Sequence, residues 1–181
     1  MAATAMFLAA CSGSSSAQTP EEEVMFMVFG VRDKDVADGV NVVKTSDTPL
    51  TMEFRADEGT LMTLGVTKED DCRYVVDMKP ANAEMPLPRG KIRFDLSGLQ
   101  KVTYERYVPS KGMGVTKLEG AELQCIETPN KCADASTYAQ GGPWEAHFGP
   151  VVQGNSAESK KAHQQALDAA VADFKANVCK P

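Results

Sequence analysis

The sequence lacks the features by which several classes of protein bind their partners or enter a membrane. Lysine and arginine never occur in a cluster longer than a pair, and 25 acidic against 19 basic residues give a formal net charge of −6. Because nucleic acids are held largely through their phosphates by clustered cations, we expect no nucleic-acid partner. No apolar run reaches the roughly 18 residues with which a helix spans a bilayer.

Common catalytic and cofactor signatures are missing as well. The chain has no G-x-S-x-G motif, no phosphate-binding P-loop and no dinucleotide fingerprint. No C-x-x-C pair occurs, and the two histidines, His147 and His163, do not stand at zinc-site spacing from any cysteine. We therefore expect no metal site and no cofactor, and the sequence favours a binding protein over an enzyme.

The N-terminal residues form a segment of their own composition. Residues 1–10 are uncharged and apolar or small, Cys11 follows them, and residues 12–18 are rich in serine. The run Leu8-Ala9-Ala10-Cys11 resembles the lipobox of bacterial lipoproteins, in which a branched apolar residue and two small residues precede the cysteine that receives lipid. The resemblance implies that 1–10 is a signal peptide, truncated because no basic residue precedes Cys11, and that 11–18 is the lipidated cysteine with a flexible tether.

The resemblance also implies a location. Two or three acyl chains, at about 0.8 kcal/mol for each buried methylene, hold such a protein on a membrane almost permanently. Ser12 follows the modified cysteine, and in lipoproteins of double-membraned bacteria a residue other than aspartate at this position favours the outer membrane. We therefore expect a lipid-anchored protein of the bacterial cell envelope, on the outer membrane and facing the periplasm.

The four remaining cysteines would then lie in a compartment that permits disulfides. Four cysteines allow three pairings. A turn-rich insert separates Cys125 from Cys132, so these two thiols can meet across a short hairpin, which leaves Cys72 to pair with Cys179. We predict these two disulfides in preference to metal ligation.

Residues 19–181 are expected to form one domain that opens with a helix. Thr19 supplies a capping hydroxyl, and Pro20 with the three acidic residues after it favours a helix start. The residues that follow are apolar almost all round, which is typical of a buried helix. Period-two alternation then predicts half-buried strands at 50–55, 72–78 and 91–96, and more weakly at 40–44, 60–67, 101–108, 118–126 and 144–148.

The last element is a predicted amphipathic helix. Asn155 and Glu158 form a capping-box pattern, and an apolar stripe of helical period that includes His163 and Phe174 continues towards the C-terminus. We interpret His163 as a boundary histidine whose hydrogen bonds are satisfied. The predicted fold is α+β: a buried N-terminal helix, a curved antiparallel sheet of about five to seven strands, and the C-terminal helix packed on that sheet.

The segment that most resembles a site is Trp144-Glu145-Ala146-His147-Phe148. On a strand, Glu145 and His147 would share one face and could transfer a proton or offer two metal ligands. Two ligands do not close a metal site, and an ordinary strand with a core tryptophan gives the same pattern. We keep Trp144, Glu145 and His147 as candidate ligand-binding residues.

Three hypotheses of function follow. We favour an envelope lipoprotein whose domain is non-catalytic and binds an envelope protein or a small molecule, or has a structural role. One alternative is an envelope hydrolase or isomerase that uses Glu145 and His147. Another is an inhibitor-like module that presents the hairpin between Cys125 and Cys132.

Overall fold

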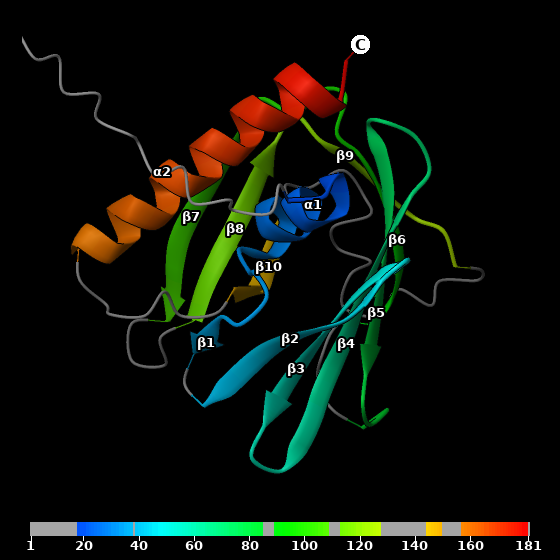
Figure 1. Cartoon of the computed structure of the whole chain (residues 1–181), viewed down its shortest axis with the longest axis vertical. Helices are drawn as coiled ribbons and strands as arrows, with labels where there is room; N and C mark the ends of the chain where they lie inside the picture. The colour runs from blue at the N-terminus through cyan, green and yellow to red at the C-terminus, as the bar shows by residue number, and fades with distance from the viewer. Residues whose placement is uncertain are drawn as a thin grey trace, which may run out of the picture.

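A computed structural model describes residues 18–37, 39–84, 89–108, 113–127, 144–149 and 157–180 of the chain (Figure 1). The helices are α1 (Pro20–Phe29) and α2 (Ala157–Asp173), and α2 continues into a π-helical turn, η1 (Phe174–Val178). The strands, in chain order, are β1 (Val36–Ala37), β2 (Val40–Asp47), β3 (Leu50–Ala56), β4 (Gly59–Lys68), β5 (Arg73–Pro80), β6 (Gly90–Asp95), β7 (Lys101–Val108), β8 (Met113–Glu119), β9 (Glu122–Cys125) and β10 (Trp144–Gly149).

The described strands form two antiparallel sheets. The larger sheet has seven strands in the order β1-β2-β3-β4-β5-β6-β9, and the smaller has three in the order β10-β8-β7. From β2 to β6 each strand pairs with the next one in the sequence, as in successive hairpins. Every second residue of β3, β5 and β6 is buried, apart from the last residues of β3 and β5, so one face of the larger sheet packs on the core and the other faces outward.

Helix α1 is the centre of the core. Its N-terminus carries a capping box in which the Thr19 hydroxyl accepts from the Glu22 N–H at 3.2 Å, while the Glu22 carboxylate accepts from the Thr19 N–H at 2.9 Å. All residues from Glu23 to Phe29 are buried, because α1 contacts β4 of the larger sheet on one side and β8, β10 and α2 on the other (Figure 1). The predicted helix start and the predicted burial are confirmed.

Helix α2 packs on β7 and α1, which confirms the α+β class with a C-terminal helix on the strands. A single side chain fastens it to the edge of β7. The Gln164 amide oxygen accepts from the backbone N–H of Tyr104 at 2.8 Å, and its NH₂ group donates to the backbone carbonyl of Val102 at 2.8 Å. Gln164 thus bonds to β7 as a neighbouring strand would, and it covers part of that edge.

The division into two sheets differs from the single sheet expected from the sequence, and a glycine explains it. The predicted strand 118–126 is broken after Glu119, so that β8 belongs to the smaller sheet and β9 to the larger one. Gly120 stands at the break with φ 86°, and a Cβ there would overlap the carbonyl oxygen of Gly98. Only glycine allows both this backbone conformation and this close approach, and the chain therefore crosses between the sheets at this position.

The C-terminal end is tied to the larger sheet by a disulfide. Cys72 and Cys179 are bonded, their Cα atoms are 4.7 Å apart, and 107 residues separate them in the sequence. Next to this bond Phe174 packs against Tyr74, with ring centroids 5.9 Å apart, and both side chains are fully buried. The bond therefore holds η1 against β5 over the core.

Candidate functional site

The residues singled out in the sequence are described to different degrees. Cys11 and Cys132 lie outside the described residues. For Trp144, Glu145 and His147 the structure describes the backbone, which forms β10 and pairs with β8 so that Trp144 lies opposite Leu118 and Glu145 opposite Lys117. Whether Glu145 and His147 form a site therefore stays a prediction.

The cysteines of the described residues are engaged in disulfides. Cys72 and Cys179 form the long-range bond that was expected from the sequence. Cys125, at the end of β9, is also disulfide-bonded. Because Cys132 lies outside the described residues, the pairing of Cys125 with Cys132 stays a prediction.

A group of side chains that the sequence patterns did not reveal gathers where α1 ends. The guanidinium of Arg32 lies over the ring of Phe26, with Cζ 3.7 Å from the ring centroid. His163 of α2 meets the same ring edge-on at 5.3 Å between centroids, and meets Tyr104 of β7 at 4.6 Å. We call Phe26, Arg32, Tyr104 and His163 the Arg32–His163 cluster.

Gly30 makes this arrangement possible. It ends α1 in the left-handed conformation, with φ 70°, and its N–H donates to the Phe26 carbonyl at 2.7 Å. The chain reverses there, and Arg32 returns over the ring of Phe26. A Cβ at Gly30 would lie 3.2 Å from the Thr116 methyl and 3.3 Å from His163 Nε2, so the cluster packs tightly around this position and would have to shift to admit a side chain.

Two nitrogens of the cluster are buried without a hydrogen-bond partner, namely Arg32 Nε and His163 Nε2. The interpretation of His163 as a satisfied boundary histidine was therefore wrong. Helical period places His163 towards the interior, but it does not supply a hydrogen-bond partner for Nε2. Burial, with a smaller contribution from the positive charge of Arg32, lowers the pKa of His163 to about 4, so the imidazole is neutral near pH 7.

A second buried polar group lies at the other end of α1. Glu23 is 7% exposed, and burial together with a hydrogen bond to Asp173 raises the pKa of its carboxyl to about 7. Asn177 donates to Asp173 at 2.6 Å from one turn further along the C-terminal helix. The Glu23 carboxyl therefore keeps its proton over part of the range below pH 7.

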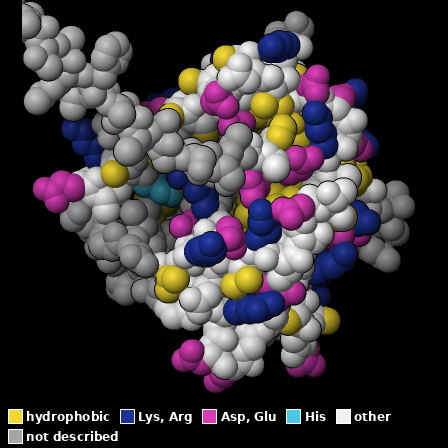
Figure 2. Space-filling view, in the orientation of Figure 1, with side chains coloured by type: hydrophobic (Ala, Val, Ile, Leu, Met, Phe, Trp, Pro, Cys, Tyr) yellow, Lys and Arg dark blue, Asp and Glu magenta, His cyan; other side chains and the backbone are white. Residues whose placement is uncertain are grey.

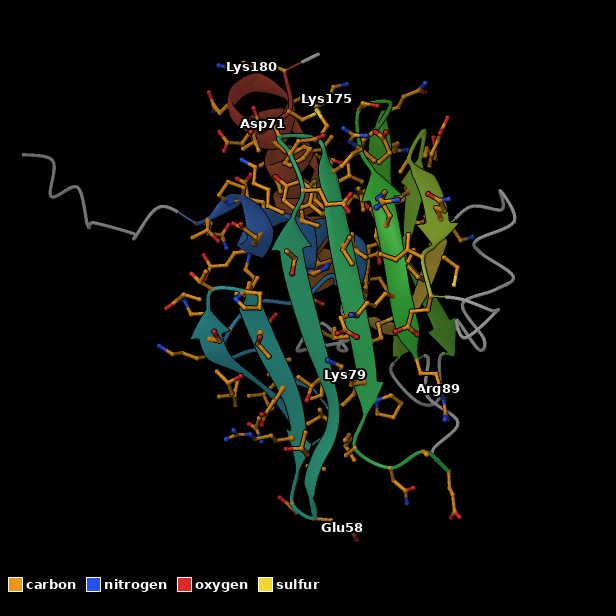
Figure 3. The ribbon with its side chains drawn as sticks, turned by 90° about the vertical axis from the view of Figure 1, so that its right-hand side faces the viewer. Glu58, Asp71, Lys79, Arg89, Lys175 and Lys180 are labelled. Atoms are coloured by element: carbon orange, nitrogen blue, oxygen red, sulfur yellow. A yellow bond between two sulfur atoms is a disulfide. The ribbon has the colours of Figure 1, made fainter. Side chains whose placement is uncertain are left out.

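The outer face of the larger sheet is organised differently (Figure 3). Arg93 forms a two-pronged ion pair with Glu69, with nitrogen–oxygen distances of 2.6 and 2.7 Å, and it also donates to Gln124 at 3.1 Å. Lys79 pairs with Asp77 at 2.7 Å on the same face. The charges of this face are thus compensated by neighbours in the sheet.

Shallow grooves on the described surface include the following two. One, of about 550 Å³, runs between the start of β7 and α2 and is lined by Lys101, Val102, Asp168 and Lys175 among others. The other, of about 380 Å³, lies at the paired ends of β5 and β6, beside Lys79 and Arg89 (Figure 3). Figure 2 shows that acidic and basic side chains are interspersed over the described surface.

Within the described ranges, no three His, Cys, Asp or Glu side chains gather closely enough to hold a metal ion. None of the helices in that part of the chain combines the length and the apolar character needed to cross a membrane. A comparison with protein-family models, with curated proteins and with solved structures finds no match to this chain.

Proposed function

We propose that the protein is a lipid-anchored lipoprotein of the bacterial cell envelope and that its folded domain binds a partner without catalysing a reaction. The observation that carries the location is the disulfide between Cys72 and Cys179. Such bonds persist in the periplasm and are reduced in most cytosols. The lipobox resemblance at Leu8 to Cys11 and the disulfide therefore support the same location, and they depend on different residues.

The buried helix end supports binding more than catalysis. A general base works best when its pKa is close to the working pH, whereas the pKa of His163 is lowered to about 4. The imidazole is therefore a weak proton acceptor near neutral pH.

Labelling with a palmitate analogue tests the anchor. In a bacterial host the wild-type chain, expressed with a complete signal sequence, should incorporate label and enter the membrane fraction. Cys11→Ala should abolish both, because the thiol that accepts the lipid is lost. Ser12→Ala is the matched control, since it changes the next residue but keeps the thiol. Undiminished labelling of Cys11→Ala would contradict the anchor.

Cross-linking in whole cells tests the binding role. The acylated wild-type protein should capture the same envelope protein or small molecule in independent preparations. The Cys11→Ala variant, which has the same domain but no anchor, is the control for contacts made after lysis. Capture patterns that do not differ between these two proteins would argue against an envelope partner.

A further inference from the structure

Glu23 is the one acidic residue that the described part of the chain buries. It is 7% exposed, its Oε2 has no hydrogen-bond partner, and it takes part in none of the ion pairs between described residues. A buried carboxylate without a cation or a donor is strongly disfavoured, whereas a protonated carboxyl needs only one acceptor. The surroundings of Glu23 therefore favour its neutral form.

The acceptor for that proton is Asp173, the last residue of α2. Its carboxyl lies within hydrogen-bonding distance of the Glu23 carboxyl, and Asn177 donates to it at 2.6 Å from one turn further along. Two carboxyl groups bond to one another only with a proton between them. Burial, with smaller contributions from the hydrogen bond to Asp173 and from its charge, raises the pKa of Glu23 to about 7, so the buried carboxyl is the one that holds the proton.

The other titratable and charged groups near this end of α1 are bonded elsewhere or are exposed, as far as the side chains are described. The hydroxyl of Tyr74 donates to the Asp71 carbonyl at 3.4 Å, and Lys175 lines the groove beside β7. Strand β8 is bonded to the other end of α1, where Thr116 donates to the Val28 carbonyl. By element the groups are Glu21 and Glu22 of α1, Lys44 of β2, which pairs with Glu22, Lys68 of β4, which pairs with Asp71, Asp70 of the next turn, which pairs with Arg73, Tyr74 of β5, and Lys175 of η1.

We propose that Glu23 and Asp173 form a pH-operated latch that holds the C-terminal helix on α1. The protonated Glu23 carboxyl donates to Asp173 and keeps the end of α2 in place. When Glu23 gives its proton to water, the hydrogen bond is lost and two carboxylates repel each other across the same contact. The inference goes beyond the proposed function, because neither the lipid anchor nor a binding partner enters it.

The chain has a natural hinge at the latch. Helix α2 ends at Asp173, and the π-helical turn that follows is closed by the Cys179 N–H, which donates to the Phe174 carbonyl at 2.8 Å. Phe174 and Tyr74 are fully buried against each other, so release exposes this aromatic contact. Cys179 stays bonded to Cys72, and the opening is therefore confined to the segment before the disulfide.

The latch opens more readily as the pH rises. The pKa of Glu23 is about 7 in the closed state against an ordinary value of 4.5, so the closed state binds more protons than the open one. The equilibrium constant for opening therefore increases between about pH 4.5 and 7 and levels off above that range. Between pH 5 and 7 we expect it to increase at least about tenfold.

Amide hydrogen exchange of the full chain, followed by nuclear magnetic resonance at pH 5, 6 and 7, tests the latch. Division by the intrinsic exchange rate at each pH gives protection factors. The reporter is the Cys179 N–H, and the reference is the Ala81 N–H, which donates to the Leu61 carbonyl at 2.9 Å beyond the far end of β5. Protection of Cys179 should fall at least about tenfold from pH 5 to 7 without a parallel fall at Ala81. No fall at Cys179, or equal falls at both amides, would overturn the proposal.

Variants assign the pH dependence to the latch. Glu23→Gln keeps a donor for Asp173 but cannot ionise, so protection of Cys179 should stay high from pH 5 to 7. Asp173→Asn, at an exposed position, removes the repulsion and should lose most of the pH dependence, and this variant serves if Glu23→Gln does not fold. Glu21→Gln, which removes the same charge two residues earlier in α1, is the matched control and should follow wild type. A pH dependence in Glu23→Gln equal to that of wild type would contradict the assignment.

Discussion

The outer face of the larger sheet and the region around α1 handle polar groups in opposite ways. On the sheet, Arg93 and Glu69 are each about one-third exposed and pair with one another. The loss of such a pair costs little free energy, because water solvates the charge that remains. Around α1, Glu23 Oε2, Arg32 Nε and His163 Nε2 are buried without a partner. The first region therefore adds modest stability, whereas the second carries an energetic cost that a proton can change.

The largest expected effect on stability comes from removing the disulfide between Cys72 and Cys179. Cys72→Ala/Cys179→Ala removes a bond that closes a loop of 107 residues, and the loop-entropy model gives a loss of about 4–5 kcal/mol. Chemical unfolding under oxidising conditions measures it. Adding reductant to wild type should cause at least this loss, because reductant also breaks the disulfide of Cys125. A loss below about 1 kcal/mol in the double variant would contradict the stabilising role of the bond between Cys72 and Cys179.

The next effect tests the corner between the two sheets. Gly120→Ala should cost about 2–4 kcal/mol, because it adds both a disfavoured left-handed conformation and an overlap with Gly98. Gly39→Ala is the control, since Gly39 has a similar φ of 78° but open space where the Cβ would lie. It should lose only the conformational part, about 1–2 kcal/mol. Equal losses in urea unfolding would show that the close approach is unimportant.

A smaller effect tests how α2 is held. Gln164→Ala removes the two hydrogen bonds to the edge of β7 and should cost about 1–2 kcal/mol, because the groups are only partly buried and water can replace the amide. Gln165→Ala, at an exposed position on the same helix, controls for the change in helix propensity. Hydrogen exchange at Tyr104 should quicken in Gln164→Ala alone, and unchanged exchange would refute the edge contact.

The smallest effect belongs to the outer face. Glu69→Gln breaks the ion pair with Arg93 and should cost less than about 1 kcal/mol, with a smaller loss at high salt. The pair holds the pKa of Glu69 below its ordinary value, so its stabilisation is present at neutral pH and disappears as the pH falls through that lowered pKa. A loss larger than that of Gln164→Ala would reverse the comparison between the two regions.

The two regions also differ in how far the sequence predicts them. Strands β3, β5 and β6 alternate between buried and outward residues over most of their lengths, and this pattern is local and visible in the sequence. The start of α1 is equally local, because Thr19 and Glu22 are three residues apart. Elements fixed by neighbours in the sequence were therefore predicted with their type and approximate position.

The Arg32–His163 cluster could not be predicted in this way. Its members come from the end of α1, from β7 and from α2, and the hydrogen bond that sets α2 on β7 joins residues 60 positions apart. The corner at Gly120 likewise depends on Gly98, which lies in the turn between β6 and β7 and is distant in the sequence. Helical period indicated that His163 faces inward, but nothing local in the sequence indicates that Arg32 lies over the same phenyl ring.

Proton binding by the two buried groups around α1 has opposite effects on stability. The folded pKa of Glu23 is about 7 against an ordinary value of 4.5, so the folded state binds more protons and this contribution to stability falls as the pH rises through that range. The folded pKa of His163 is about 4 against 6.5, so the unfolded state binds more protons and this contribution rises with pH. Each slope is at most about 1.4 kcal/mol per pH unit.

The most direct test measures the free energy of unfolding by urea titration from pH 4.5 to 7.5. Wild type is compared with Glu23→Gln and His163→Gln. Wild type should vary little between about pH 4.5 and 6.5, because the two slopes oppose each other. His163→Gln should lose stability as the pH rises, whereas Glu23→Gln should gain it. Glu58→Gln, at the exposed tip of the β3–β4 hairpin (Figure 3), should follow wild type. Identical profiles for all four proteins would contradict the claim that buried titratable groups distinguish the region around α1 from the outer face of the larger sheet.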